Sequence, residues 1–379
     1  MSIKQKTIIE SQAPTRIDLA GGTIDIWPLY LFLDRPTTLN LAINLFAEAR
    51  LEITPESKQP GICLRSEDQN TELLLSWADL RERRQVPPQV ELHFKLLRFF
   101  YEKRRNAGWT EVKDDQSSLT LSTRAKSPAG AGLGGSSTLS IAMIGSLATW
   151  ADSQDSNIPI NPLHSGEAFI EIVRDVETTV IQVPAGLQDY YGAMFGGLQC
   201  LQWGPGTHQR ESLDPSLIPE LEKRILLFYS GQSRNSGINN WALFKGFIDQ
   251  QSEIRARFQA ISNATTSLKN ALLSRDWAAT GAAIAEEWKI RKTLAPGITT
   301  SSIDQAFQEA HRLAPISGKV CGAGGGGCFF VYLPEVASSN EGSHLKTEIQ
   351  EIFISHGMRP LPFEGVPHGL RVQVRHEGF

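Results

Sequence analysis

The chain has 379 residues, a formal net charge of −4 and 41% apolar residues, a composition typical of a globular protein with room for two domains. Its basic residues form no broad cluster beyond Arg81–Arg84 and Lys103–Arg105, which we interpret as solvated helix faces, so nucleic acid is not an expected partner. The cysteines and histidines lack the spacing of metal ligands, so we expect no zinc site. No apolar run reaches the roughly 20 residues that span a bilayer, so we expect no membrane anchor and a cytoplasmic location.

The first third of the chain is rich in predicted strands. Four segments alternate in polarity or run apolar at strand length: Thr7–Glu10, Ala42–Ile53, Ile62–Arg65 and Leu119–Thr123. Residues 90–106 have helical periodicity, with basic residues in the last turn and Gly108 as a stop signal. After a glycine-rich loop, residues 136–150 (SSTLSIAMIGSLATW) are apolar nearly all round, which predicts a buried helix. A further helix is predicted from Leu163 to about Ile181.

The second half of the chain mixes strands with longer helices. The predicted elements are a strand over 224–229, helical patterns over 236–274, 277–293 and 302–313, a strand–loop–strand over 319–333, a helix near 345–355 and a strand over 370–374. Such mixed blocks indicate an α+β protein. The Gly- and Pro-containing stretch 204–219 is the best candidate for a boundary, which divides the chain into domains 1–205 and 206–379.

The glycine-rich loop, SPAGAGLGGSST (127–138), opens the predicted buried helix. Glycines let backbone N–H groups approach a phosphate, and a helix N-terminus favours an anion. The G-x-G-x-x-G spacing resembles a dinucleotide site, but a polar stretch separates the loop from the preceding strand and the next acidic residues lie in a polar loop. Two interpretations remain: a tight turn that serves packing alone, and a triphosphate site in which a serine hydroxyl coordinates Mg²⁺. It is not a P-loop, because no Walker lysine follows.

Three motifs, in order, resemble those of the GHMP kinases, the superfamily named for galactokinase, homoserine kinase, mevalonate kinase and phosphomevalonate kinase. They are residues 13–25 (APTRIDLAGGTID), 128–137 (PAGAGLGGSS) and 319–328 (KVCGAGGGGC), and they span almost the whole chain. Within the superfamily, four segments most resemble the kinases of heptose 7-phosphate and the fucokinase domains: RIDLAGGTID, PAGLQDYYGAMFGG, FYSGQSRNS and WKIRKTLAPGI. Two departures are Gly135 in place of the first Ser of GLGSS, and TID in place of GTD ahead of Trp27 and Pro28, so the substrate pocket is expected to differ.

The resemblance implies a two-domain GHMP kinase fold of the α+β class. Its N-terminal domain has a left-handed β-α-β unit, its C-terminal domain is ferredoxin-like, and the site lies between them. It also implies an ATP- and Mg²⁺-dependent kinase acting on a small molecule, a sugar or sugar phosphate, as a monomer or homodimer. A mevalonate- or phosphomevalonate-type kinase, a catalytically silent binding protein and, least favoured, an NAD-dependent oxidoreductase are the alternatives.

By the same resemblance, each role falls on particular residues. Those implied to hold ATP are Pro128, Gly130, Gly132, Leu133, Gly134, Gly135, Ser136 and Ser137. Those implied to contact the substrate are Gly21, Gly22, Asp25, Gly324, Gly325 and Gly326, with Ser233 and Arg234 as weaker candidates.

The chemistry would depend on four further assignments. Asp189 accepts or orients the acceptor hydroxyl, Arg16 is its partner, and Ser136 with Glu177 holds Mg²⁺. Without the resemblance, Asp189 is interpreted as a turn residue, Arg16 as a surface residue beginning a strand and Glu177 as part of a solvated acidic helix face.

Overall fold

Two β-sheets form the framework of the described part of the chain, which comprises residues 5–106, 116–128, 130–152, 166–206, 208–231, 244–249, 252–322, 324–335 and 340–378 of a computed structural model. The larger sheet has the order β12-β1-β2-β5-β3-β4, and β6 and β7 extend it beside β2. Its strands are β1 (Gln5–Ala20), β2 (Thr37–Thr54), β3 (Gly61–Ser66), β4 (Thr71–Leu75), β5 (Ser118–Ala125), β6 (Leu198–Gln202), β7 (Gln209–Ser212) and β12 (Arg371–Gly378).

Strand β1 is much longer than the predicted strand Thr7–Glu10 and contains most of the first motif. It pairs with β2 in antiparallel register along nearly its whole length, with a shift between Pro14 and Thr15. Its second half is buried throughout. The prediction stopped too early because this half carries buried polar residues, which interrupt an apolar pattern.

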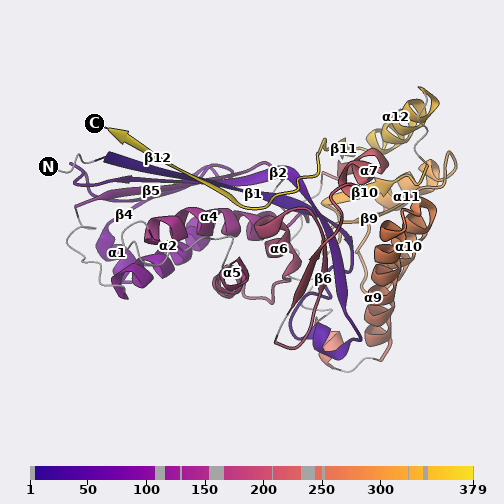
Figure 1. The fold of residues 1–379 in the computed structure, drawn as a ribbon, viewed down its shortest axis with the longest axis horizontal. Helices are drawn as coiled ribbons and strands as arrows, with labels where there is room; N and C mark the ends of the chain where they lie inside the picture. The colour runs from indigo at the N-terminus through magenta and orange to yellow at the C-terminus, as the bar shows by residue number, and fades with distance from the viewer. Residues whose placement is uncertain are drawn as a thin grey trace.

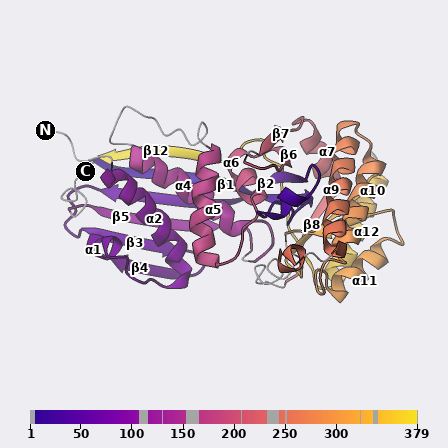
Figure 2. The same ribbon diagram turned by 90° about the horizontal axis from the view of Figure 1, so that it is seen from below.

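Helices cover one face of the larger sheet (Figures 1 and 2). They are α1 (Trp77–Arg81), α2 (Pro88–Asn106), α4 (Gly135–Asp152), α5 (Gly166–Ile181) and α6 (Gln188–Phe195). Helix α4 packs against β1 and β2 on one side and against α2, α5 and α6 on the other. Ile141, Met143, Ile144 and Leu147 are fully buried, so the predicted buried helix is confirmed.

The smaller sheet has the order β11-β8-β10-β9, and all its pairs are antiparallel. Numbered along the chain, this order is 4-1-3-2, and helices connect the first strand to the second and the third to the fourth, as in a ferredoxin-like β-α-β-β-α-β unit. Its strands are β8 (Ile225–Tyr229), β9 (Ser317–Val320), β10 (Cys328–Tyr332) and β11 (Arg359–Pro360). The helices around it are α7 (Leu217–Arg224), α9 (Ser252–Leu273), α10 (Trp277–Arg291), α11 (Ser301–Ala310) and α12 (Asn340–Ser355).

The end of the chain returns to the larger sheet. Strand β12 pairs with β1, so the two ends of the described chain lie at the same end of this sheet (Figure 1). On the way, the segment that follows β11 is held against β2 by the backbone bonds Asn44 N to Glu364 O, 2.9 Å, and Val366 N to Ala42 O, 3.0 Å. The domain boundary at residue 205 remains a prediction, and residues on both sides of it contribute to the larger sheet.

Some predicted helix boundaries lie outside the described residues. Helix α5 begins at Gly166 where the prediction began at Leu163, and the pattern over 236–274 corresponds to a short helical segment at 244–248 and to α9. Ser233 and Arg234 also lie outside the described residues. No helix of the described residues is long and apolar enough to cross a membrane.

Candidate active site

A cavity of about 890 Å³ lies where the glycine-rich loop meets β1, α5 and α6. Many residues singled out by the sequence line it: Arg16, Asp25, Pro128, Gly130, Gly132, Gly134, Gly135, Ser136, Ser137, Glu177 and Asp189. Gly322, from the third motif, lines it as well. Residues from three distant parts of the chain therefore meet around one cavity.

The glycine-rich loop is packed too tightly to accept side chains. Gly132 has φ +75°, and a Cβ there would lie 2.6 Å from the carbonyl oxygen of Cys321. A Cβ on Gly134, φ +74°, would lie 2.8 Å from Cγ of Asp189. The loop also receives a hydrogen bond of 2.6 Å from Cys328 N to Ala131 O. These glycines thus let the loop lie directly between the third motif and Asp189, and it leads into the N-terminus of α4.

Arg16 and Asp189 form an ion pair beside this loop. Nε of Arg16 donates to Oδ1 of Asp189 at 2.8 Å, and Nη2 donates to the same oxygen. Nη1 donates to the carbonyl oxygen of Gly132 at 2.8 Å, so one guanidinium joins the carboxylate to the loop. The Arg16 side chain is 3% exposed and that of Asp189 is 22% exposed, so the carboxylate is the member open to the cavity.

Burial raises the pKa of the Asp189 carboxyl, and the charge of Arg16 opposes that rise. A carboxylate that is ionised but more basic than in water is suited to accept a proton. Asp189 lies in the first turn of α6, a helix that was not predicted from the sequence because it is short, contains Gly192 and lies between Gly186 and Gly196.

Glu177, on α5, is a second buried carboxylate of the cavity. Its Oε2 accepts hydrogen bonds from the hydroxyls of Tyr190, 2.8 Å, and Ser140, 3.3 Å. Burial raises the pKa of Glu177, and hydrogen bonds from Ser136 and Tyr190 oppose that rise. These described partners are neutral hydroxyls, so none of them supplies the positive charge that a bound cation would bring to this carboxyl group. The interpretation of Glu177 as a residue on a solvated face is wrong, because it is 3% exposed.

Asp25 lies in the same cavity and is 1% exposed. Its Oδ2 accepts the backbone N–H of Gln188 at 2.9 Å, and a Cβ on Gly186 would lie 2.4 Å from this oxygen. Burial raises the pKa of Asp25 to about 7, against the lowering effect of the Gln188 hydrogen bond. Asp25 therefore contacts the backbone of the residue that precedes Asp189.

Several residues implied by the resemblance do not line the cavity. Leu133 is buried and its carbonyl oxygen accepts the backbone N–H of Arg16 at 3.4 Å. Gly324 and Gly325 pack beside Ile298, with Gly325 N donating to Ile298 O at 2.6 Å, and Gly326 is not in the lining of the cavity either. Gly21 and Gly22 form a turn behind the cavity.

A group of charged residues behind this turn was missed by the sequence analysis. Asp18, Glu287, Arg291 and Lys319 are all buried and paired with one another. The one available signal was Lys319 beside Val320 and Cys321 in a predicted strand, because a lysine that is buried in a strand needs a partner.

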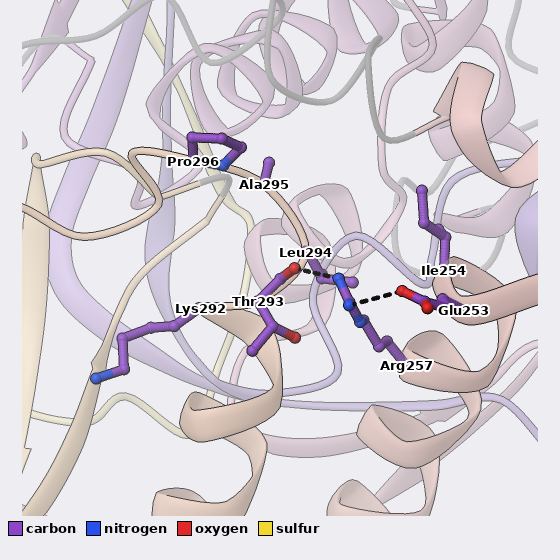
Figure 3. A pocket seen from close by; sticks show the side chains of 8 residues that line it. All are labelled: Glu253, Ile254, Arg257, Lys292, Thr293, Leu294, Ala295 and Pro296. Atoms are coloured by element: carbon purple, nitrogen blue, oxygen red, sulfur yellow. Dashed lines mark hydrogen bonds and ion pairs between the residues drawn. The ribbon is translucent and has the colours of Figure 1, made fainter. Parts of the chain in front are cut away.

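A second cavity, of about 630 Å³, lies between the start of α9 and the end of α10 (Figure 3). Figure 3 shows Arg257 directed toward Glu253 and toward the backbone of Thr293. The other cation of its lining, Lys292, is 3.5 Å from Asp304. Both cations are thus paired with carboxylates, and we assign this cavity no ligand.

Comparison with known families agrees with this geometry. The model for the N-terminal domain of GHMP kinases matches residues 93–197, and that for the C-terminal domain matches residues 268–346. The chain belongs to the GHMP kinases and has their two-domain fold. It is therefore an ATP-dependent phosphotransferase that acts on a hydroxyl of a small molecule.

The proteins and solved structures that resemble the chain over most of its length include several sugar kinases. The chain is 26% identical over 343 residues to D-glycero-α-D-manno-heptose 7-phosphate kinase of Campylobacter jejuni, covering 88% of this chain and 91% of that protein. It is 24% identical over 338 residues to the bifunctional fucokinase/GDP-fucose pyrophosphorylase of Arabidopsis thaliana, covering 87% of this chain and 30% of that protein. A D-glycero-D-manno-heptose 1-phosphate kinase structure from Bacteroides thetaiotaomicron has a TM-score of 0.68 at 21% identity, covering 96% of this chain and 98% of that one. A mevalonate kinase of Thermococcus onnurineus matches a smaller share, 60% of this chain.

Proposed function

We propose that this chain transfers the γ-phosphoryl group of ATP to a hydroxyl of a sugar or sugar phosphate, with Mg²⁺ as the metal. The Arg16–Asp189 pair carries the proposal. Arg16 bonds both the glycine-rich loop and the Asp189 carboxylate, and that carboxylate is open to the cavity. A phosphate on the loop and a hydroxyl on Asp189 would then be neighbours.

The nucleotide phosphates bind on the loop. Backbone N–H groups of residues 130–137 can donate to phosphate oxygens, and the N-terminus of α4 attracts their negative charge. Neither interaction requires a side chain, which suits a loop of glycines. Pro128 and Leu133 shape the loop, the latter through its backbone contact with Arg16.

The metal is held by the hydroxyl of Ser136 and the carboxylate of Glu177. Ser136 is exposed at the cavity, and the described partners of Glu177 are neutral hydroxyls, so a cation bound beside it would stabilise the ionised carboxylate against the effect of burial. Mg²⁺ prefers such oxygen ligands completed by phosphate and water, and when bound it neutralises the phosphate oxygens.

Asp189 acts on the acceptor. The acceptor oxygen forms a bond to the γ-phosphorus, the bond from that phosphorus to the β–γ bridging oxygen breaks, and the hydroxyl proton passes to the Asp189 carboxylate. The raised pKa of Asp189 favours this proton transfer, and Arg16 keeps the carboxylate ionised and fixed in direction. Arg16 also places positive charge beside the transferring group.

The acceptor binds in the cavity beside Asp25, at the end of the turn that begins with Gly21 and Gly22. Contact of the acceptor with the glycines 324–326 remains a prediction. Carboxylates of Asp25 and Asp189 in one cavity suit the hydroxyls of a sugar. The similarity to a heptose 7-phosphate kinase and to a fucokinase supports a heptose phosphate or fucose-like acceptor. Assembly as a monomer or homodimer and a cytoplasmic location remain predictions.

A screen for ADP release tests the proposal. Heptose phosphates, fucose, galactose, uronic acids and mevalonate are each incubated with ATP and Mg²⁺, and we expect turnover with a sugar or sugar phosphate. Turnover with mevalonate alone, or with none of the panel, would overturn it. In parallel, ATP and not NAD should raise the melting temperature, because only a ligand of the folded state stabilises it by mass action.

A further inference from the structure

Four charged side chains form a buried network behind the turn at residues 21–23. Lys319, on β9, donates to Oδ2 of Asp18, on β1, and to Oε1 of Glu287, on α10, each at 3.0 Å. Arg291, one turn further along α10, donates through Nε to the same Glu287 oxygen at 2.8 Å. The four side chains are at most 2% exposed, and their two positive and two negative charges balance.

The network forms hydrogen bonds with backbone groups of the turn. Nη2 of Arg291 donates to the carbonyl oxygen of Gly22 at 2.9 Å, and the backbone N–H of Gly21 donates to Oε1 of Glu287 at 3.3 Å. A Cβ on Gly22 would lie 2.3 Å from Oδ2 of Asp18, so the turn lies against the network with no room between them. Two peptide groups of the turn, Ala20–Gly21 and Gly22–Thr23, are therefore held by one helix of the smaller-sheet unit.

The turn is held in a conformation that its own residues do not favour. Thr23 has φ +72°, a left-handed value that is unusual for a β-branched residue. Nη1 of Arg291 lies 3.5 Å from the Thr23 hydroxyl, so the same guanidinium contacts the strained residue. Backbone strain of this kind persists only where the surroundings hold it in place.

The turn is connected to the reaction centre through Asp25. Asp25 follows Thr23 by two residues, and its carboxylate accepts the N–H of Gln188, the neighbour of Asp189. A shift of the turn would therefore move Asp25 and, through it, the first turn of α6.

We propose that Glu287 and Arg291 are positioning residues that fix the acceptor-binding turn 21–25 from helix α10. The inference rests on the proposed function in one respect, that Asp25 and this turn receive the acceptor. Among the described residues, the hydrogen bonds of the network run to the turn and not to the glycine-rich loop, so the network acts on acceptor binding and not on ATP binding.

Stability alone does not account for the network. Taking charges out of water costs several kcal/mol per ion, and replacing a buried ion group with apolar residues is often neutral or stabilising. Glu287 is ionised because the charges of Arg291 and Lys319 outweigh its burial and lower its pKa. The turn is thus held by charge-assisted hydrogen bonds, which are stronger and more directional than neutral ones.

Arg291→Lys tests the proposal. Lysine keeps a positive charge beside Glu287, but it lacks the planar fork that bonds Glu287 and Gly22 together. We expect the KM for D-glycero-α-D-manno-heptose 7-phosphate, or for the panel sugar with the highest turnover, to rise about tenfold, the factor for one lost hydrogen bond from a charged donor. The KM for ATP should stay unchanged. Hydrogen exchange of the backbone amides at residues 21–25 should become faster in the protein without ligands.

The matched control is Arg224→Lys. Arg224 also pairs with a glutamate four residues earlier on a helix, Glu220, at 2.7 Å, and is largely buried, but it lies on α7 away from the turn. This variant should leave both KM values and the exchange at 21–25 unchanged.

The outcomes separate this inference from the proposed function. If the wild-type protein phosphorylates no sugar, the proposed function fails, and the exchange measurement still decides whether Arg291 holds the turn. If Arg291→Lys leaves the acceptor KM and the exchange at 21–25 unchanged, or raises both KM values equally, the positioning role is overturned. Should Arg291→Lys not fold, Glu287→Gln decides, because glutamine keeps the side-chain size but removes the charge that holds Arg291 and the N–H of Gly21. A raised acceptor KM in that folded variant supports the proposal, and an unchanged one overturns it.

Discussion

Asp189→Asn tests the proposed chemistry with little change in shape. Asparagine keeps the side-chain volume and an oxygen that can accept from Arg16, but it cannot take up a proton from the acceptor. A positioned general base contributes about 10²–10⁴-fold to a rate, so we expect kcat to fall by a factor in that range. The KM for ATP should change little, because the loop meets Asp189 only at the packed surface of Gly134.

The stability of this variant follows from two opposing effects. Removing one partner of a fully buried ion pair costs about 3–5 kcal/mol. The Asp189 side chain is 22% exposed and its pKa is raised by burial, so the loss of its charge also relieves a desolvation cost. Arg16 keeps its bond to Gly132 O. We therefore expect a net loss of about 1–2 kcal/mol, which leaves the protein folded.

Steady-state ADP release and thermal unfolding, measured on the same preparations, provide the test. Asp214→Asn is the control, because Asp214 forms an ion pair with Arg275, 3.3 Å, on the surface, and its kcat should equal that of wild type. The double variant Arg16→Met with Asp189→Asn removes both charges, so it should regain stability without regaining activity. A folded Asp189→Asn protein with kcat within tenfold of wild type would refute the role of Asp189.

Three further changes test other parts of the site. Gly132→Ala places a Cβ 2.6 Å from the Cys321 carbonyl oxygen at φ +75°, so we expect a lower melting temperature and a higher KM for ATP, and unchanged values would contradict the packing argument. Glu177→Gln should raise the Mg²⁺ concentration for half-maximal activity about tenfold in a titration at fixed ATP, as expected for a lost carboxylate ligand; an unchanged titration would remove Glu177 from the metal site. Burial raises the pKa of Asp25 to about 7 from 3.8, so the folded protein keeps this proton where the unfolded chain has lost it. Stability should therefore fall as the pH rises from about 4 to about 7 and stay level above. Urea unfolding across this range should show a smaller fall in Asp25→Asn, and an equal fall would contradict the assignment.

Elements whose pattern is contiguous in the sequence could be predicted from it. The glycine-rich loop and the apolar helix after it are contiguous, so their pattern predicted α4 and its buried position. The assignments of Arg16, Glu177 and Asp189 came from the resemblance, since residues up to 173 positions apart carry no local sign of their proximity. Their roles remain predictions, although the structure brings all three to one cavity.

The buried charged network and helix α6 could not be predicted from the sequence, because both depend on contacts between distant parts of the chain. Asp18 and Lys319 are separated by 301 residues, and neither position identifies the other as its partner. Glu287 and Arg291 have the spacing of an ordinary surface pair on a helix, and only the packing of α10 against the turn makes them a buried pair. Helix α6 escaped prediction because its eight residues are held by tertiary contacts, and so short a helix is marginal by itself.

Strand β1 links the proposed catalytic pair to the buried network. Residues two apart on a strand face the same side, so β1 directs Arg16 toward Asp189 and Asp18 toward Lys319 at one register. The register shift between Pro14 and Thr15 lies just before both residues, and a slip of one position would turn both side chains to the opposite face. The ion pair that we propose to act on the acceptor and the network that we propose to hold the acceptor turn therefore depend on the same strand pairing. It follows that the smaller-sheet unit contributes through β9 and α10 to the geometry of a site whose reacting groups all lie on the larger-sheet unit.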